Sequence, residues 1–198
     1  MAIVRPKTST GGGNKFYGIC EANIVGYTDK STNFHWADIF IEVEIKQKDS
    51  DYTKKLQIAG SLDKDSDGKV SGGSVLNRMY KFFDVIDCKA GVNLDGHFED
   101  EDGTPILDIA EYLNKNFVNS GDLCPFLVYV YKSVPKPNET QSYTRVVPKI
   151  HLNTEKGMEQ MKNDISYMKS KGLIKEIDPN VQPTDKQVNL GNGALDNL

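Results

Sequence analysis

Residues 35–46 read HWADIFIEVEIK, and this stretch decides the fold class. Every second residue from Ala37 to Ile45 is apolar, which is the pattern of a β-strand that buries one face. The opposite face should be plainly polar, yet it carries Trp36 and Phe40 among charged side chains. The stretch therefore predicts a strand with one face in a core and an aromatic, charged face turned toward a binding partner.

The last two predicted strands, residues 125–133 and 143–152, repeat this alternation of apolar residues with rings and cations. A lysine of the third predicted strand, residues 52–61, also falls opposite that strand's core positions. Flat rings can stack on unpaired bases, and cations can neutralise phosphates. The sequence thus predicts a nucleic-acid-binding face made of Trp36, Phe40, Lys55, Tyr129, Tyr131, Tyr143, Arg145 and Lys149.

A packing interpretation stands beside this one for the aromatic residues. The three tyrosines could form cross-strand pairs or be covered by a helix. Trp36 could close one end of a barrel, because tryptophan is highly buried on average. Both interpretations keep the same strands and differ in what covers their outer face.

The order of predicted elements indicates a mainly β fold with added helices. Three strands (residues 16–27, 35–47 and 52–61) precede a helix at 74–86 with Ser74 as its N-cap. A second helix starts at Thr104-Pro105, and the strand pair 125–133 and 143–152 follows it. Pro148 places the last strand at an edge or a bulge. This order predicts a five-stranded OB-like barrel with a helix after strand three, and a small α+β sandwich is the alternative.

The domain organisation follows from the same pattern. Residues 1–14 form a Gly/Ser/Thr-rich flexible arm, and residues 15–152 form the OB-like core with a helical and irregular acidic insertion at 88–118. A C-terminal helix lies within 153–177, and residues 178–198 are predicted to be disordered. Within the core, the loops at 28–33 and 134–142 flank the expected binding face.

Composition excludes several classes of protein. The chain has 198 residues, 38% of them hydrophobic, which suits one domain with extensions. Mean hydropathy is -0.49 and no apolar run approaches a membrane span, so no membrane partner is expected. We expect a cytoplasmic protein without a secretory signal, because its three cysteines are odd in number and widely spaced. The net charge of -4 is compatible with nucleic-acid binding because two loops hold much of the acid.

One short motif resembles a metal site. The spacing of Asp63, Asp65, Asp67 and Gly68 matches the first half of an EF-hand calcium loop. The twelfth position, which should be a bidentate glutamate, is Ser74. We therefore favour a solvated turn and keep the three aspartates as weak calcium candidates.

Catalytic motifs are missing from the sequence. His35, His97 and His151 are scattered, and no nucleophile or phosphate-loop motif is present. The acidic run at 99–102 is typical of a solvated loop. We expect neither an enzyme nor a cofactor.

The arrangement as a whole resembles the single-stranded DNA-binding proteins of bacteriophage replication. The matching stretches are KFYGICEANIVGY (15–27), IAGSLDKDSDGKVSGGSVLNRMYKFFDVI (58–86), FLVYVYKS (126–133) and YTRVVPKIHL (143–152). The resemblance implies single-stranded DNA as the partner, in replication or recombination, and replication proteins recruited through the C-terminal tail. Tails of this family are strongly acidic, whereas this one holds only Asp185 and Asp196 after Asp178.

A second hypothesis makes the chain a structural or interaction protein, for instance a virion component. Its aromatic face would then pack against another subunit, because exposed apolar patches also mark protein interfaces. Salt separates the two hypotheses, since counterion release makes only nucleic-acid binding steeply salt-dependent.

Overall fold

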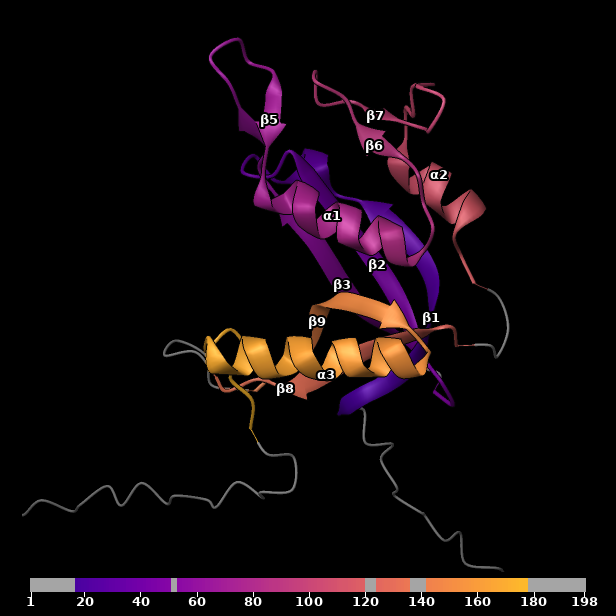
Figure 1. The fold of residues 1–198 in the computed structure, drawn as a ribbon, viewed down its shortest axis with the longest axis vertical. Helices are drawn as coiled ribbons and strands as arrows, with labels where there is room; N and C mark the ends of the chain where they lie inside the picture. Colours follow the sequence, from indigo (N-terminus) through magenta and orange to yellow (C-terminus); the bar gives the residue numbers. More distant parts are fainter. Residues whose placement is uncertain (1–16, 51–52, 120–123, 136–141, 178–198) are drawn as a thin grey trace, which may run out of the picture.

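The computed structural model describes residues 17–50, 53–119, 124–135 and 142–177 (Figure 1). The predicted arm (1–14) and the predicted disordered tail (178–198) lie outside the described residues. Within the part described, no helix combines the length and apolar character that crossing a bilayer requires.

Five long antiparallel strands form one curled sheet: β1 (Gly18–Asp29), β2 (Ile39–Gln47), β3 (Thr53–Gly60), β8 (Phe126–Lys132) and β9 (Thr144–Leu152). Their order is β3-β2-β1-β8-β9, so β1 to β3 form a meander and β8 returns beside β1. The sheet curls until its two edge strands, β3 and β9, lie close together. The predicted fold class, a mainly β OB-like barrel with added helices, is confirmed.

The alternation read from the sequence builds the core. β2 contributes Ile39, Ile41, Val43 and Ile45, each at most 2% exposed. Helix α1 (Ser74–Val85) packs on this core through an apolar stripe that includes the fully buried Met79. The helix begins where the sequence predicts, but its N-cap is Gly73 rather than Ser74, and no side chain caps it.

Helix α2 (Ile109–Asn116) starts later than the sequence predicts. Its N-cap is Asp108, whose side chain accepts a hydrogen bond from the Glu111 N–H. Thr104 and Pro105 are not the helix start, because Pro105 pairs with Glu99 in a β-bridge. A Thr-Pro pair can stand at a helix start or in a short extended segment. Here it is extended, because the Asp100 side chain in the preceding turn accepts a hydrogen bond from the Thr104 N–H.

Asn114 of α2 closes an open edge of β1. β1 pairs with β8 only from Gly18 to Ala22, and among the described residues no strand pairs with the later part of that edge. The Asn114 side chain accepts from the Tyr27 N–H at 2.9 Å and donates to the Tyr27 carbonyl at 2.8 Å. Covering an edge in this way prevents pairing with another chain.

The seam between β3 and β9 stays open. β9 carries Pro148, and the β8–β9 register shifts between Val128 and Val130, as expected for a proline at a bulge or an edge. Proline has no N–H to donate to a neighbouring strand. Among the described residues no ladder joins β9 to β3, so two sheet edges face each other without pairing.

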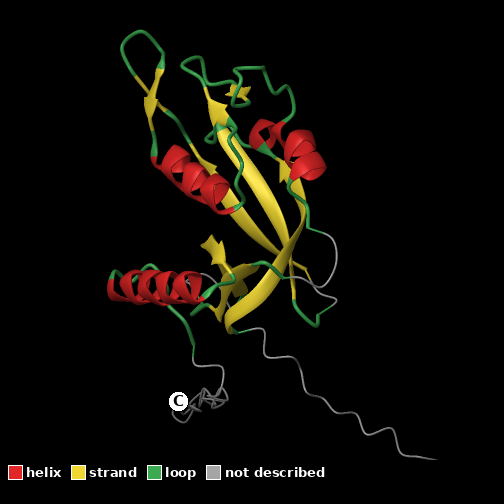
Figure 2. Ribbon diagram, turned by 45° about the vertical axis from the view of Figure 1, so that its right-hand side comes forward, coloured by secondary structure: helices red, strands yellow, loops and turns green. Residues whose placement is uncertain are grey.

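Helix α3 (Glu155–Ser170) forms a second layer on the outer face of β8 and β9 (Figure 2). Its Met161 and Ile165 pack with Leu127 and Tyr129 of β8 in a second apolar cluster. The N-cap of α3 is Thr154, whose hydroxyl accepts from the Gly157 N–H at 3.0 Å. β8 therefore has apolar contacts on both faces, one with the barrel core and one with α3.

Candidate nucleic-acid interface

The open seam forms a hollow that collects three of the predicted binding residues. Lys55 comes from β3, Tyr131 from β8 and Arg145 from β9, and all three line one cavity of about 380 Å³. The remaining described residues around this cavity, which we call the seam hollow, are Lys54, Gln57, Thr144, Val146 and Pro148. Three cations and one phenol ring surround the hollow, and none of its described lining residues is acidic.

A buried carboxylate lies close to these cations. Glu42 of β2 is 5% exposed and forms ion pairs with Lys55 at 2.7 Å and Lys30 at 3.0 Å. The Gln57 amide donates to it at 3.3 Å. Burial alone would raise the pKa of Glu42, but the hydrogen bonds from Lys55, Lys30 and Gln57 outweigh burial and lower it. The carboxylate stays ionised and neutralises one of the two lysine charges.

The aromatic residues of β2 lie at the other end of that strand. Trp36 precedes β2, in the loop after β1, and is 60% exposed. Phe40 is only 5% exposed, because the Phe34 ring stacks on it at a centroid distance of 4.7 Å. Trp36 lies 6.0 Å from both rings. The accessible rings of this aromatic cluster are therefore Phe34 and Trp36, with Phe40 beneath them.

Sequence reasoning missed Phe34, because the predicted turn ended at residue 33 and the predicted strand began at residue 35. The parity it shares with Trp36 and Phe40 was the available signal. Phe40 and Glu44 are about 13 Å apart along β2, from the usual rise per residue. Glu44 pairs with Lys55, and Glu42 pairs with Gln57, so the residues that line the seam hollow begin about 7 Å along the strand from Phe40 and reach about 13 Å.

The tyrosines of β8 are partly covered, as the packing interpretation allowed. Tyr129 is 8% exposed under α3, and its hydroxyl donates to Glu176 at 2.6 Å. Burial raises the pKa of Tyr129, and the hydrogen bond to Glu176 acts in the same direction. Tyr131 stacks on Tyr129 with ring centroids 6.1 Å apart and reaches the seam hollow. Tyr143 is 49% exposed, just before β9.

Lys149 lies on the α3 side of β9, away from the seam hollow. Its ammonium group forms an ion pair with Asp164 of α3 at 2.5 Å, and His151 contacts the same carboxylate at 3.0 Å. Burial would raise the pKa of Asp164, but the hydrogen bonds from Lys149 and His151 lower it overall. The charge of Lys149 is thus largely balanced within the fold.

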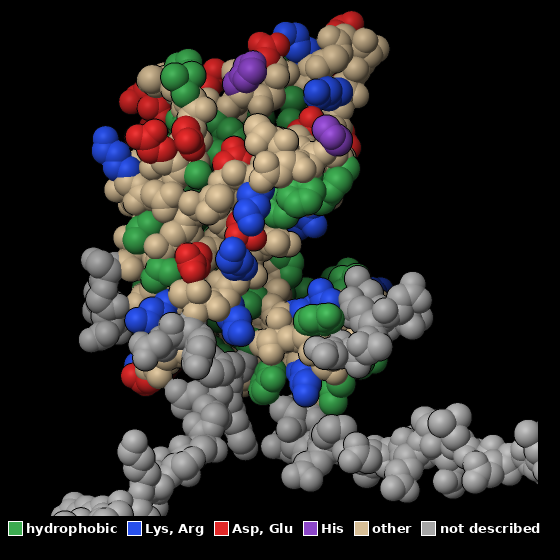
Figure 3. All heavy atoms as spheres, turned by 180° about the vertical axis from the view of Figure 1, so that it is seen from behind, with side chains coloured by type: hydrophobic (Ala, Val, Ile, Leu, Met, Phe, Trp, Pro, Cys, Tyr) green, Lys and Arg blue, Asp and Glu red, His purple; other side chains and the backbone are tan. Residues whose placement is uncertain are grey.

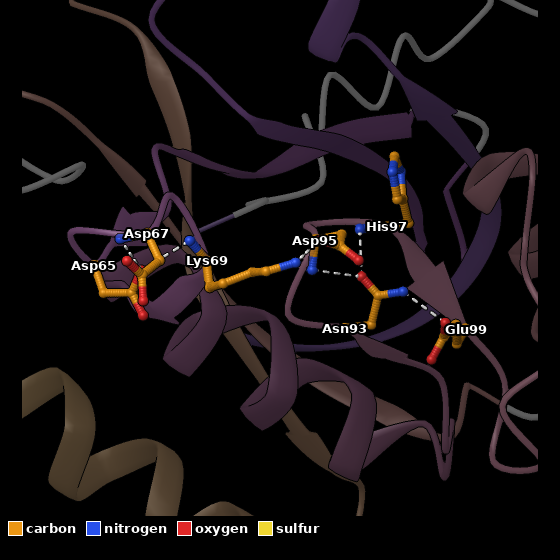
Figure 4. A network of polar contacts seen from close by, with 7 residues as sticks. All are labelled: Asp65, Asp67, Lys69, Asn93, Asp95, His97 and Glu99. Carbon is orange, nitrogen blue, oxygen red and sulfur yellow. Dashed lines mark hydrogen bonds and ion pairs between the residues drawn. The ribbon is translucent and has the colours of Figure 1, made fainter.

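The calcium candidates lie in a turn that uses them structurally. Asp65 accepts hydrogen bonds from the N–H groups of Asp67 and Lys69, both at 2.9 Å (Figure 4). Asp63 lies in the short strand β4 (Asp63–Lys64), paired with β5 (Val70–Gly72). Among the described residues, no group of three or more ligand side chains could hold a metal ion.

The same five-residue turn occurs three times: DSDGK (65–69), NLDGH (93–97) and DEDGT (100–104). In each copy the first side chain accepts from the third and fifth N–H groups, between 2.8 and 3.1 Å. The glycine has φ between 78° and 87°, which residues with a Cβ rarely adopt. The insertion predicted to be irregular is therefore ordered into hairpins, including β6 (Gly91–Val92) with β7 (Phe98–Glu99).

These turns gather acid at one end of the molecule. An ion pair between Lys69 and Asp95 links two of them (Figure 4). The Val70 N–H also donates to the Leu94 carbonyl at 2.8 Å. In the view of Figure 3, Asp and Glu side chains are densest near the top, whereas Lys and Arg side chains are more frequent lower down. The repeat N/D-x-D-G was visible in the sequence and would have predicted the hairpins.

Models of protein families, curated proteins and solved structures were compared with this chain, and none matches it.

Proposed function

We propose that this chain is a single-stranded DNA-binding protein that acts in DNA replication or recombination, in the manner of the bacteriophage proteins its arrangement resembles. The observation that supports the proposal best is the seam hollow. Lys55, Tyr131 and Arg145 are far apart in the sequence and converge there, and the buried Glu42 that pairs with Lys55 is shared with Lys30. Cations beside an accessible ring are what a strand of phosphates and unpaired bases requires.

The aromatic cluster supplies a second contact of the same kind. Phe34 and Trp36 expose ring faces in the loop after β1, where the OB-fold carries loops that bind oligonucleotides. Base stacking on such rings is worth about 1–3 kcal/mol per base. A strand held at both places would follow β2 from the cluster to the seam hollow.

Binding by stacking and charge needs no catalytic residue and no cofactor. The function is proposed for the cytoplasm, because Cys20, Cys88 and Cys124 are buried thiols that suit a reducing compartment. Recruitment of replication proteins through residues 178–198 belongs to the same proposal.

The decisive experiment is a fluorescence titration with oligo(dT) at several salt concentrations. Lys55→Ala and Arg145→Ala should each flatten the plot of log K against log salt by about 0.7, the value for one released counterion on a single strand. Lys149→Ala should flatten it less, because Asp164 balances the Lys149 charge, whereas Glu42 is shared between Lys55 and Lys30 and balances only one of these two charges. Lys115→Ala, on α2 and outside the seam hollow, is the matched control.

Two results would contradict the proposal. One is the absence of oligo(dT) binding at low salt. The other is binding whose salt slope is unchanged in the Lys55 and Arg145 variants. A salt-insensitive association between protein chains that Trp36→Ala abolishes would favour the structural, virion-type alternative.

A further inference from the structure

A second cavity, of about 520 Å³, lies on the other side of β9. It is formed between α1, β9 and α3, and we call it the helix cleft. Its volume falls within the range of about 300–1,000 Å³ that is usual for ligand pockets. Of the polar contacts described so far, those of Lys149 and His151 with Asp164 lie at the helix cleft.

The helix cleft and the seam hollow meet at one residue. Pro148 lines both cavities, whereas Val147 beside it is buried and lines neither. Val146 belongs to the seam hollow, whereas Lys149 and Ile150 belong to the helix cleft. The register shift of β9 at this point makes the crossing possible, because a bulge redirects side chains that regular pleating would keep on one face.

The lining of the helix cleft suits a nucleotide. Arg78 and Lys81 project from exposed positions of α1 and supply positive charge. Phe82 and Ile150 contribute an apolar surface, and Gln160 is one of three amide side chains that can hydrogen-bond to base edges. Asp84 and Asp164 oppose the cations, so the cleft is less positive than the seam hollow.

We propose that the helix cleft binds the continuation of the same single strand, which leaves the seam hollow over Pro148 and places one or two unstacked nucleotides between α1 and α3. This inference rests on the proposed function. It makes the footprint longer than the sheet face alone provides, within the range of about 4–16 nucleotides known for OB-folds. Short oligonucleotides occupy the aromatic cluster and the seam hollow, and only longer ones reach Lys81.

The test compares oligo(dT) of four and sixteen nucleotides on the full chain. Lys81→Ala should release one counterion fewer, which flattens the salt slope by about 0.7. If both proteins bind equally at 1 M salt, the variant should bind the sixteen-mer about fivefold more weakly at 0.1 M salt. The same variant should leave the four-mer unchanged. Lys162→Ala, an exposed lysine of α3 outside the helix cleft, is the matched control and should change neither.

A second variant fills the helix cleft without removing a charge. Gln160 is exposed at the rim, and Gln160→Trp should reduce the affinity of the sixteen-mer toward that of the four-mer. If both variants bind both lengths like the wild type, or lose both equally, the strand does not pass through the helix cleft. In that case the seam hollow is still tested by Lys55→Ala, whereas failure of every oligonucleotide to bind would overturn the proposed function itself.

Discussion

Neutralising Glu42 should tighten DNA binding while it weakens the fold. In the wild type, Glu42 holds Lys30 and Lys55 through ion pairs of 3.0 and 2.7 Å, so the three groups together carry one net positive charge. Glu42→Gln keeps the side-chain volume and raises that charge by one. One more phosphate can then be neutralised, and the salt slope should steepen by about 0.7. If both proteins bind equally at 1 M salt, this difference in slope gives the variant an affinity about fivefold higher at 0.1 M salt.

The same substitution should cost stability, because the carboxylate is buried. Hydrogen bonds to charged groups are worth about 1.5–3 kcal/mol each. Lys30 and Lys55 are partly exposed, so solvent screening reduces the expected loss to about 1–2 kcal/mol. Urea unfolding measures this loss, and oligo(dT) titration measures the gain in affinity.

A matched control is Glu21→Gln, which removes an exposed ion pair with Lys48 that lines neither cavity. It should change the salt slope little. Unchanged or weaker DNA binding by Glu42→Gln, in a variant that unfolding shows to be folded, would refute the idea that Glu42 competes with DNA for these lysines.

Three further predictions concern the aromatic cluster and the docking of α3. Trp36 fluorescence should be quenched by oligo(dT), and Trp36→Ala should cost about 1–3 kcal/mol of binding, whereas equal emission with and without DNA would exclude stacking there. Gly157→Ala should lower the melting temperature sharply, because a Cβ would lie 1.9 Å from the Leu152 carbonyl oxygen; an unchanged melting temperature would contradict this close approach. The pKa of Asp164 is lowered in the fold, so its ion pair with Lys149 should stabilise the protein fully at pH values above 3.8, the ordinary pKa of the aspartate. This stabilisation should be lost as the pH falls through the lowered pKa of the folded state. The stability difference between wild type and Asp164→Asn should therefore shrink below pH 3.8, and a difference independent of pH would show that the ion pair contributes nothing.

Local patterns accounted for the elements and the core. The alternation in residues 35–46 identified the core positions of β2, because side chains in a strand point to opposite faces in turn. The apolar stripe of α1 followed from helical periodicity in the same way. The start of α2 was wrong, since the Asp100 turn bonds the Thr104 N–H that a helix N-terminus would have left open.

For the residues predicted to bind nucleic acid, the sequence indicated the face of the strand but not what covers it. Parity correctly placed Lys55, Tyr131 and Arg145 on outer faces, and the structure brings them together in the seam hollow. Parity could not show that Phe40 lies under Phe34. What covers an outer face depends on segments distant in the sequence, and no local period reports them.

The sequence by itself determined which side chains share a face, and with it the strands, the helix stripes and an OB-like order. Only the tertiary structure decided which of those faces stay accessible. α3 covers Tyr129, and its Asp164 balances Lys149. Among the described residues β9, which carries Pro148, does not pair with β3, and the curl of the sheet brings these two edges together around the seam hollow. The physical reason is that alternation is set by backbone geometry within a strand, whereas exposure is set by packing between elements.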